Sequence, residues 1–225
     1  MSRSGSKSGS SRPRELKAWQ ERAIRVVAGS PLAPELVFGG GTALAAVHFH
    51  HRLSEDLDFF LARMPEPEEV VSLGRALATA TTRVDLEVVA PRTSLILRRG
   101  PRVVGKIDFA YYPYDPVGRR TSWRGLAVES LVDMTVNKLQ AVLTRQQPRD
   151  FVDLYFLLRE GPERDLSRLL ELTRAKFDVG AHAMGLAARF LLVHDLRELP
   201  RLVRPVRLAE LVAFFEARAR DLARG

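Results

Sequence analysis

The spacing of hydrophobic and polar residues changes along this chain and divides it into two parts. Between about residues 30 and 125, short apolar runs are separated by glycine- and proline-containing turns, and several runs alternate apolar with polar residues as strands do. From about Val128 to the end, the apolar residues follow the helical period of about 3.6 residues. We therefore expect an α+β fold in which a mixed sheet is followed by a helical C-terminal part.

The pattern also predicts the individual elements. In the first part, helices are expected at 15–28, 42–49 and 65–80, and strands at 35–41, 56–62, Val84–Ala90, Thr93–Arg98 and Val103–Tyr112. The second helix is expected to begin with Thr42 near its N-cap. In the helical part, the expected helices are Val128–Arg145, Arg149–Glu160, Asp165–Phe177, Val179–Leu199 and Arg207–Arg224.

The composition is that of a globular protein with an excess of basic residues. The chain has 225 residues, of which 46% are hydrophobic, and its formal net charge is +8 at pH 7. Arginine dominates the basic residues and suits bidentate contacts to phosphate, so a polyanionic partner is physically reasonable. The absence of cysteine excludes disulfides and favours an intracellular, cytoplasmic location. No apolar run approaches the ~20 residues that cross a bilayer.

The first fourteen residues, MSRSGSKSGSSRPR, contain four basic residues and no acid. They lack the apolar core of a secretory signal. The simplest interpretation of residues 1–14 is a disordered basic arm, and an arm that contacts nucleic acid is the alternative. The sheet part is then expected at residues 15–125 and the helical part at 126–225.

Asp56 and Asp58 are the first candidates for chemistry. Residues two apart on a strand point to the same face, so both carboxylates would project together while Leu57 and Phe59 point into the core. The two Cα atoms would lie about 6 to 7 Å apart. Like charges at this spacing repel each other unless a divalent cation lies between them. The alternative is an edge strand whose acids face solvent.

A third carboxylate, Asp108, lies on a later expected strand whose opposite face carries Ile107 and Phe109. It could therefore stand beside the first two acids. Mg²⁺ is usually held by one or two carboxylates together with substrate phosphates. Three carboxylates on neighbouring strands suit two metal ions about 3.5 to 4 Å apart, which assist an in-line displacement at phosphorus.

The segment GGGTAL, residues 39–44, lies between an expected strand and an expected helix. Glycines at such a turn let backbone N–H groups approach a phosphate closely, and the start of the helix favours negative charge. Thr42 and Ser54 add hydroxyl groups that can bind phosphate oxygens or cap the backbone. A tight turn with a capped helix is the purely structural alternative.

The sequence HFHH places His48 and His51 three residues apart, but no acid or cysteine stands at a familiar zinc spacing. We therefore expect no zinc site there. His51 and Arg52 precede the two acids, and we expect them to orient these acids or to contact a ligand.

In the helical part, Lys138 and Arg145 lie two turns apart on one helix face, and Asp150 and Asp153 follow on the next helix. The short connection QQPR predicts that these helices pack antiparallel, with the acids near the bases. Desolvation offsets the attraction within a buried ion pair, so such a pair makes more sense beside a phosphate pocket. An ordinary interhelical salt bridge remains the alternative.

Three segments together resemble a known family. GGGTALAAVHFHHRLSEDLDFF, KIDF and NKLQAVLTRQQPRDFVDLYFLL are similar to the AbiEii/AbiGii-type nucleotidyltransferase toxins, which include the MenT-type toxins. The resemblance runs from about Leu36 to Leu158. It implies a DNA polymerase β-like nucleotidyltransferase core, a helical C-terminal part that completes the active site, and a cognate antitoxin.

The resemblance also implies roles for individual residues. Gly40, Gly41, Thr42, Arg52, Ser54 and Lys138 would bind the nucleotide, Asp56, Asp58 and Asp108 would bind metal, and Asp56, Asp58, Asp108, Lys138 and Asp153 would form the catalytic set. The family's usual double glycine is a triple one here, so the sequence does not decide which two glycines line the phosphates.

The implied reaction is Mg²⁺- or Mn²⁺-dependent transfer of a nucleotide from an NTP to RNA, since characterised MenT-type members modify tRNA 3′ ends. A two-metal mechanism would serve this transfer, and a polyanion-binding surface could be formed by Arg197, Arg201, Arg204 and Arg207. A merely solvated basic face is the alternative for these arginines. Two other functions stay open, a protein-nucleotidylating or phosphate-transferring enzyme and a non-catalytic nucleotide-binding partner.

Overall fold

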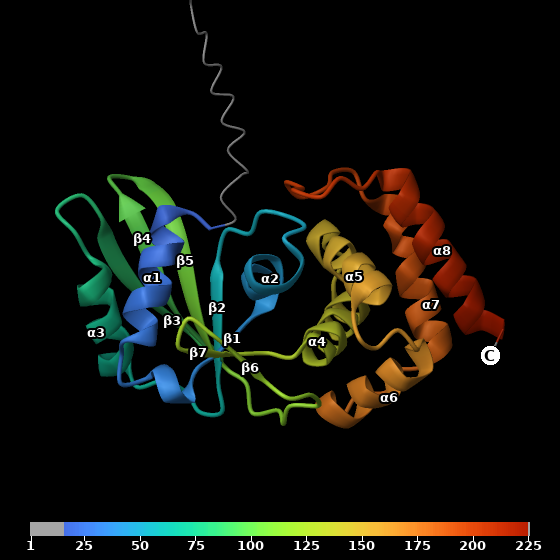
Figure 1. The fold of residues 1–225 in the computed structure, drawn as a ribbon, viewed down its shortest axis with the longest axis horizontal. Helices are drawn as coiled ribbons and strands as arrows, with labels where there is room; N and C mark the ends of the chain where they lie inside the picture. Colours follow the sequence, from blue (N-terminus) through green and yellow to red (C-terminus); the bar gives the residue numbers. More distant parts are fainter. Residues whose placement is uncertain (1–15, 225) are drawn as a thin grey trace, which may run out of the picture.

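The computed structural model describes residues 16–224, so the expected arm at residues 1–14 lies outside the described residues. The fold is α+β, as predicted: a mixed seven-stranded sheet in the order β3-β4-β5-β2-β1-β7-β6 is followed by a group of helices (Figure 1). The strands are β1 (Val37–Gly39), β2 (Leu57–Leu61), β3 (Arg83–Val89), β4 (Arg92–Arg99), β5 (Arg102–Tyr111), β6 (Thr121–Trp123) and β7 (Leu126–Val128).

The helices lie on both sides of the sheet. They are α1 (Ala18–Ala28), α2 (Gly40–Ala43), α3 (Pro67–Leu77), α4 (Leu131–Thr144), α5 (Pro148–Glu160), α6 (Leu166–Phe177), α7 (Ala183–Leu191) and α8 (Leu208–Arg224), with a π-helical turn at Leu44–Phe49 and 3₁₀ turns at Ala33–Glu35 and Leu192–Asp195. Helices α1 and α3 lie on one side of the sheet, and α2, α4 and α5 lie on the other (Figure 1). No helix within residues 16–224 combines the length and the apolarity that a membrane span needs.

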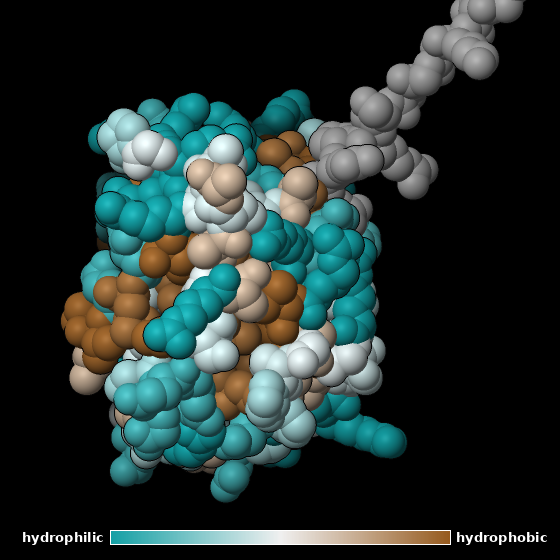
Figure 2. Space-filling view, turned by 90° about the vertical axis from the view of Figure 1, so that its left-hand side faces the viewer, coloured by the Kyte–Doolittle hydropathy of each residue, from teal (hydrophilic) through white to brown (hydrophobic). Residues whose placement is uncertain are grey.

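The apolar side chains form two cores. Alternation along β2 sends Leu57, Phe59 and Leu61 to one face, where they join the core that α1 and α3 cover. The second core lies among α4 to α8 and includes the fully buried rings of Phe190 and Phe215. Viewed from the side of α1 and α3, the surface mixes hydrophilic residues with hydrophobic ones (Figure 2).

Strand pairing aligns polar residues of neighbouring strands in one row. Asp58 on β2 pairs with Gly39 on the antiparallel strand β1 and with Asp108 on the parallel strand β5. Asp108 pairs in turn with Ser94 on β4. Strand β7 runs parallel to β1 on its other side, and Glu129 follows directly after it. The row therefore gathers acids on the face opposite α1 and α3.

Most predicted elements are confirmed to within a few residues, but the helix expected to begin at Thr42 starts earlier. Its first turn begins at Gly40, and Gly39 is the N-cap. Gly40 has a φ of 66°, which a residue without a Cβ adopts easily. The chain can therefore turn from strand to helix two residues sooner than the hydrophobic pattern indicates.

The expected helix Val128–Arg145 is wrong at its start. Val128 is the last residue of β7, and α4 begins at Leu131, after Ser130 has capped it by accepting the Asp133 N–H at 3.0 Å. Strands β6 and β7 have three residues each, too few to show an alternating pattern. The sheet thus extends to Val128, and the domain boundary at residues 125 and 126 stays a prediction.

The expected helix Val179–Leu199 is also too long. The α-helix α7 covers only Ala183–Leu191, and the chain leaves helical structure after the 3₁₀ turn at Leu192–Asp195. The following segment runs back to the sheet part, where Leu53 N–H donates to the carbonyl oxygen of Arg201 at 2.8 Å. This contact brings a segment of the helical part next to the row of acids.

Candidate active site

A cavity of about 770 Å³, here called the central pocket, lies where the sheet meets the helical part. On the sheet side its polar lining consists of Gly40, Gly41, Arg52, Ser54, Glu55, Asp56, Asp58, Arg92, Lys106 and Asp108. On the helical side it consists of Glu129, Asn137, Lys138, Arg145, Arg149 and Arg201. The pocket thus brings together the predicted site residues except Thr42 and Asp153, which lie behind its walls.

Asp56 and Asp58 carry negative charge that no ion pair within residues 16–224 compensates. Burial raises the pKa of Asp58 to about 6, and the nearby charge of Asp108 adds to this effect. Burial also raises the pKa of Asp56, and Asp108 contributes there as well. Both pKa shifts indicate that these two carboxylates would strongly attract a cation placed between them.

Asp108 stands beside Asp58, as expected, but its carboxylate is already engaged. Ser94 Oγ donates to its Oδ1 at 2.5 Å, and Lys106 Nζ lies 3.0 Å from the same oxygen. Arg92 Nη1 lies 3.4 Å from Oδ2. Asp108 is therefore neutralised by side chains of the protein, whereas the other two acids are not.

The glycine turn lies against both walls of the pocket. A Cβ on Gly40 would overlap the carboxylate of Asp58, and a Cβ on Gly41 would overlap the guanidinium of Arg52. Gly39 does not line the pocket, and a Cβ on Gly39 would overlap the carboxylate of Glu129 and the ring of Phe60. Of the three glycines, Gly40 and Gly41 are therefore the two whose backbone faces the pocket, as the family resemblance suggested.

The two hydroxyl residues differ in their positions. Ser54 lines the pocket, and its backbone carbonyl accepts a hydrogen bond from Gln20 Nε2 at 3.1 Å. Thr42 is buried, and its hydroxyl donates to the backbone carbonyl of Asp56. Thr42 thus fixes the start of β2 and does not face the pocket, so of its two expected roles the structure supports the backbone one.

Asp153 lies behind the pocket lining and binds two of its cations, Arg52 and Lys138. It is fully buried, and Arg52 grips it through Nε at 2.6 Å and Nη2 at 2.8 Å. Lys138 Nζ lies 2.7 Å from its Oδ2. Burial alone would raise the pKa of Asp153, but the two cations outweigh it and hold that pKa well below its usual range. Asp153 contacts side chains of the protein and holds them in place, and its expected place in the catalytic set stays a prediction.

Lys138 also contacts Asp150 at 2.7 Å, and Arg145 Nε donates to the same carboxylate at 2.7 Å. The antiparallel packing of α4 and α5 predicted from the short connection is what brings these groups together. Removing one partner of a buried ion pair is costly, because the other charge is left uncompensated. The network therefore fixes the ammonium of Lys138 at the pocket wall.

His51 belongs to this network and not to the pair of acids that follows it. Its Nε2 lies 2.7 Å from Asp153 Oδ1, and its ring packs 4.9 Å from that of Phe156. Burial lowers the pKa of His51, although Asp153 opposes this shift. His51 and Arg52 were expected to orient Asp56 and Asp58, but their hydrogen bonds go to Asp153 instead, because the chain turns at His50.

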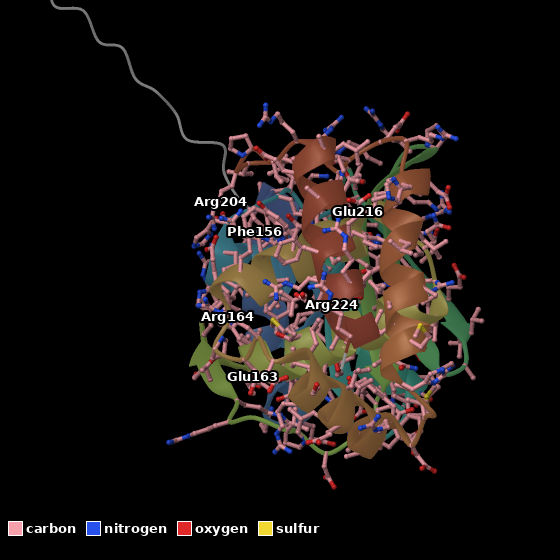
Figure 3. All side chains as sticks on the ribbon, turned by 90° about the vertical axis from the view of Figure 1, so that its right-hand side faces the viewer. Phe156, Glu163, Arg164, Arg204, Glu216 and Arg224 are labelled. Atoms are coloured by element: carbon pink, nitrogen blue, oxygen red, sulfur yellow. The ribbon has the colours of Figure 1, made fainter. Side chains whose placement is uncertain are left out.

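The four C-terminal arginines have different surroundings, and the surface they were expected to form stays a prediction. Arg204 lies over the ring of Phe156 at 4.6 Å (Figure 3) and pairs with Glu160 at 2.7 Å. Arg207 pairs with Glu210 at 3.0 Å. Arg197 is exposed and does not line the central pocket, whereas Arg201 does.

Sequence reasoning missed several residues of the pocket. Lys106 and Arg92 were not singled out, although Lys106 stands two residues before Asp108 and so shares its face. Glu129 directly follows the missed strand β7, and Asn137 lies in the middle of α4. No pattern in the sequence pointed to Glu129, because its position depends on the pairing of β7 with β1.

Comparison with known proteins then decides the family. A family model described as "Nucleotidyl transferase AbiEii toxin, Type IV TA system" matches residues 24–224. The chain belongs to this family. It is therefore a nucleotidyltransferase toxin of the type IV toxin–antitoxin class, a family whose members act on NTPs and have an antitoxin partner.

Individual relatives agree with this assignment. An uncharacterised protein of Aquifex aeolicus is 29% identical over 169 residues, which cover 73% of this chain and 77% of the relative. A crystal structure of a putative nucleotidyltransferase from Helicobacter pylori matches with a TM-score of 0.59 at 20% identity over 92% of each chain. The nucleotidyltransferase toxin MenT4 of Mycobacterium tuberculosis matches with a TM-score of 0.60 at 19% identity, over 91% of this chain and 81% of that one. These structures share the fold.

The family's divalent metal fits the residues present. Within residues 16–224, no three His, Asp or Glu side chains converge closely enough to hold an ion unaided. Asp56 and Asp58 nevertheless offer uncompensated oxygen ligands beside a glycine turn. Mg²⁺ suits a site with only two carboxylates, because it is usually held by one or two carboxylates while substrate phosphates and water complete its coordination.

The glycine turn allows a matched pair of substitutions. Gly40 and Gly100 both have a positive φ, of 66° and 57°. Alanine at either position costs about 1–2 kcal/mol of backbone strain, but at Gly40 its Cβ would also overlap Asp58, whereas nothing lies within 4 Å at Gly100. We expect Gly40→Ala to lower metal-dependent NTP binding at least about tenfold, since misplaced ligands lose binding sharply. Equilibrium binding measures this.

Gly100→Ala serves as the control and should bind NTP like the wild type while losing similar backbone stability in urea unfolding. Equal NTP binding by both variants would show that the turn does not position Asp58.

The acids make stability depend on pH in a defined direction. Since the pKa of Asp58 is raised to about 6 in the folded state, the unfolded chain loses this proton first as pH rises, and the folded state is destabilised between about pH 4 and 6 and remains so above. Asp58→Asn removes this cost. It should therefore raise the free energy of unfolding at pH 8 by about 1–3 kcal/mol and leave it almost unchanged near pH 3.5.

Urea titrations in EDTA at the two pH values measure the effect. Asp85→Asn is the control, because Arg83 and Arg98 lower the pKa of Asp85 and the substitution should not stabilise the protein at pH 8. A loss of stability in Asp58→Asn at pH 8 would contradict the idea of an uncompensated acid.

Proposed function

We propose that this chain transfers a nucleotide from an NTP to a hydroxyl group of RNA, with the tRNA 3′ end as the acceptor, in a reaction that needs Mg²⁺ or Mn²⁺. The observation that carries the proposal is the division of charge in the central pocket. Uncompensated Asp56 and Asp58 lie on the sheet side, and the fixed cations Lys138 and Arg52 lie beside the glycine turn. A metal-bound triphosphate complements both charges at once.

The triphosphate would lie along the Gly40–Gly41 turn, within reach of Lys138. The ammonium of Lys138 has three donors, of which Asp150 and Asp153 take two, so one is left for a phosphate oxygen. Arg52 is held by Asp153 against Gly41. Because these groups are fixed before the substrate arrives, they stabilise the charge of the transferring phosphates without reorganisation.

Asp56 and Asp58 would hold the divalent ion, which when bound polarises the phosphate and neutralises its charge. The acceptor hydroxyl attacks the α-phosphorus, the bond to the β-phosphate breaks, and pyrophosphate leaves. The hydroxyl proton needs a base, and Asp108 is the carboxylate beside the pair. Lys106 must first move off its Oδ1 for Asp108 to take this proton or to bind the second ion of a two-metal mechanism.

RNA is the acceptor that the pocket surroundings favour. Arg92, Arg149 and Arg201 are exposed and line the pocket from different elements. Exposed arginines around such a site suit a phosphate backbone better than a protein side chain. The net charge of +8 adds a general attraction for polyanions.

A toxin of this family works against an antitoxin. We propose that the cognate antitoxin is encoded next to this chain and that both act in the cytoplasm, where NTPs and tRNA are present. Growth arrest on expression of the wild type, relieved by Asp58→Ala, would support this part of the proposal.

The direct test incubates the purified protein with Mg²⁺, total RNA, total protein and NTPs labelled at the α- or the γ-phosphate. Label from the α-phosphate should appear on RNA, and sequencing of RNA 3′ ends should show added nucleotides. Asp58→Asn and Lys138→Met should each lower the rate at least about 10²-fold, as loss of a fixed charge at a transferring phosphate does. Glu68→Gln, an exposed change on α3, should keep the wild-type rate.

Other outcomes identify the alternatives. Label on a protein band would assign protein nucleotidylation, and γ-label on any acceptor would assign phosphate transfer. Binding of NTP with no transfer to RNA or protein would assign a non-catalytic partner. Each of these results would overturn the RNA assignment.

A further inference from the structure

A second cavity, of about 300 Å³, adjoins the central pocket. It is here called the aromatic pocket. Phe60 and Glu129 line both cavities and so mark the place where they adjoin. Tyr112 and Tyr114 form further walls, with ring centroids 4.9 Å apart, and Tyr112 lies 4.8 Å from Phe60.

The two cavities follow one line along β2. Side chains at alternate positions of a strand share a face, so Asp58 and Phe60 point to the same side, about 6.6 Å apart along the strand. The metal-binding acids lie at the start of this line and Phe60 lies at its end. A nucleotide whose phosphates lie at Asp58 and the glycine turn would therefore place its nucleoside toward Phe60.

Glu129 is the chemically unusual group between the cavities. It is 5% exposed and forms no ion pair within residues 16–224, and its carboxylate accepts hydrogen bonds from Asn137 Nδ2 and from the backbone N–H of Gly40. Burial raises the pKa of Glu129 to about 7, which the more distant charge of Lys176 reduces in part. A buried carboxylate accepts up to about four hydrogen bonds, of which the protein supplies two here, so Glu129 keeps capacity to accept from a ligand in the adjoining cavity.

A chain of hydrogen bonds orients this carboxylate. The hydroxyl of Tyr112 donates to Asn137 Oδ1 at 2.7 Å, and Asn137 Nδ2 donates to Glu129 Oε1 at 2.7 Å. The donors of the chain all point toward Glu129, so the oxygens of Glu129 and Tyr112 keep capacity to accept. The site is thus built to receive N–H groups next to aromatic faces.

We propose, on the basis of the proposed function, that the aromatic pocket is the nucleobase subsite and that Glu129 is the specificity-determining residue, which accepts a hydrogen bond from an exocyclic amino group of the base. Aromatic rings stack on any base and so give affinity without selection. A carboxylate accepts from an amino group, such as N4–H₂ of cytosine, and has no such partner in uracil. The pocket should therefore prefer amino-bearing bases to uracil.

The test measures equilibrium binding of the four α,β-methylene NTP analogues, with Mg²⁺, to the wild type, Glu129→Gln and Tyr112→Phe. The wild type should bind at least one amino-bearing analogue about tenfold or more tightly than the uridine analogue. Glu129→Gln offers a donor as well as an acceptor and should reduce this ratio at least about fivefold. Tyr112→Phe keeps the ring but frees Asn137, and it should reduce the ratio less.

Two controls separate the possible failures. Glu68→Gln, exposed on α3, should keep the wild-type ratio. Lys138→Met should weaken all four analogues and inorganic tripolyphosphate alike. If it does so while Glu129→Gln and Tyr112→Phe leave the ratio unchanged, the nucleobase subsite is wrong and the triphosphate site stands.

If Lys138→Met binds like the wild type, the proposed function itself fails. A loss of discrimination between ribose and deoxyribose analogues in Glu129→Gln, with the base ratio unchanged, would assign Glu129 to the sugar and overturn the proposal. Should Glu129→Gln fail to fold, as judged by circular dichroism, the ratio in Tyr112→Phe decides.

Discussion

The buried carboxylate of Asp153 is the interaction on which the site depends. It binds Arg52 of the sheet part and Lys138 of the helical part at 2.6 to 2.8 Å, and so joins the two walls of the central pocket. A buried ion pair adds little to stability against an apolar alternative, since desolvation offsets the attraction. Its benefit is geometric, because both cations are fixed at the pocket wall before a nucleotide arrives.

The sheet places the opposite charge where the fold cannot satisfy it. Pairing of β1, β2 and β5 aligns Gly39, Asp58 and Asp108 in one row. The strand register therefore determines which residues lie beside these acids. Lys106 pairs with Asp108, whereas Asp56 and Asp58 have no ion-pair partner within residues 16–224. Functional sites commonly retain such locally unfavourable groups, and the stability they lose is recovered when the ligand binds.

Short-range patterns in the sequence predicted those features of the site that depend on residues close together in the chain. The alternation along β2 and β5 gave the common face of the acids, and the short connection after α4 gave the contact between Lys138 and Asp150. The sequence did not reveal contacts that depend on side-chain conformation or on the pairing of distant strands. Lys106 meeting Asp108 depends on side-chain conformation, and Glu129 reaches the pocket through β7, a strand too short to show a period.

The most direct measurement is a crystal structure of the protein with Mn²⁺ and an α,β-methylene NTP analogue, recorded with anomalous scattering at the manganese edge. The account predicts an anomalous peak bound by Asp56 and Asp58, with the triphosphate along Gly40–Gly41 and an oxygen bonded to Lys138. A metal peak away from these carboxylates, or a triphosphate that does not contact the glycine turn, would contradict it.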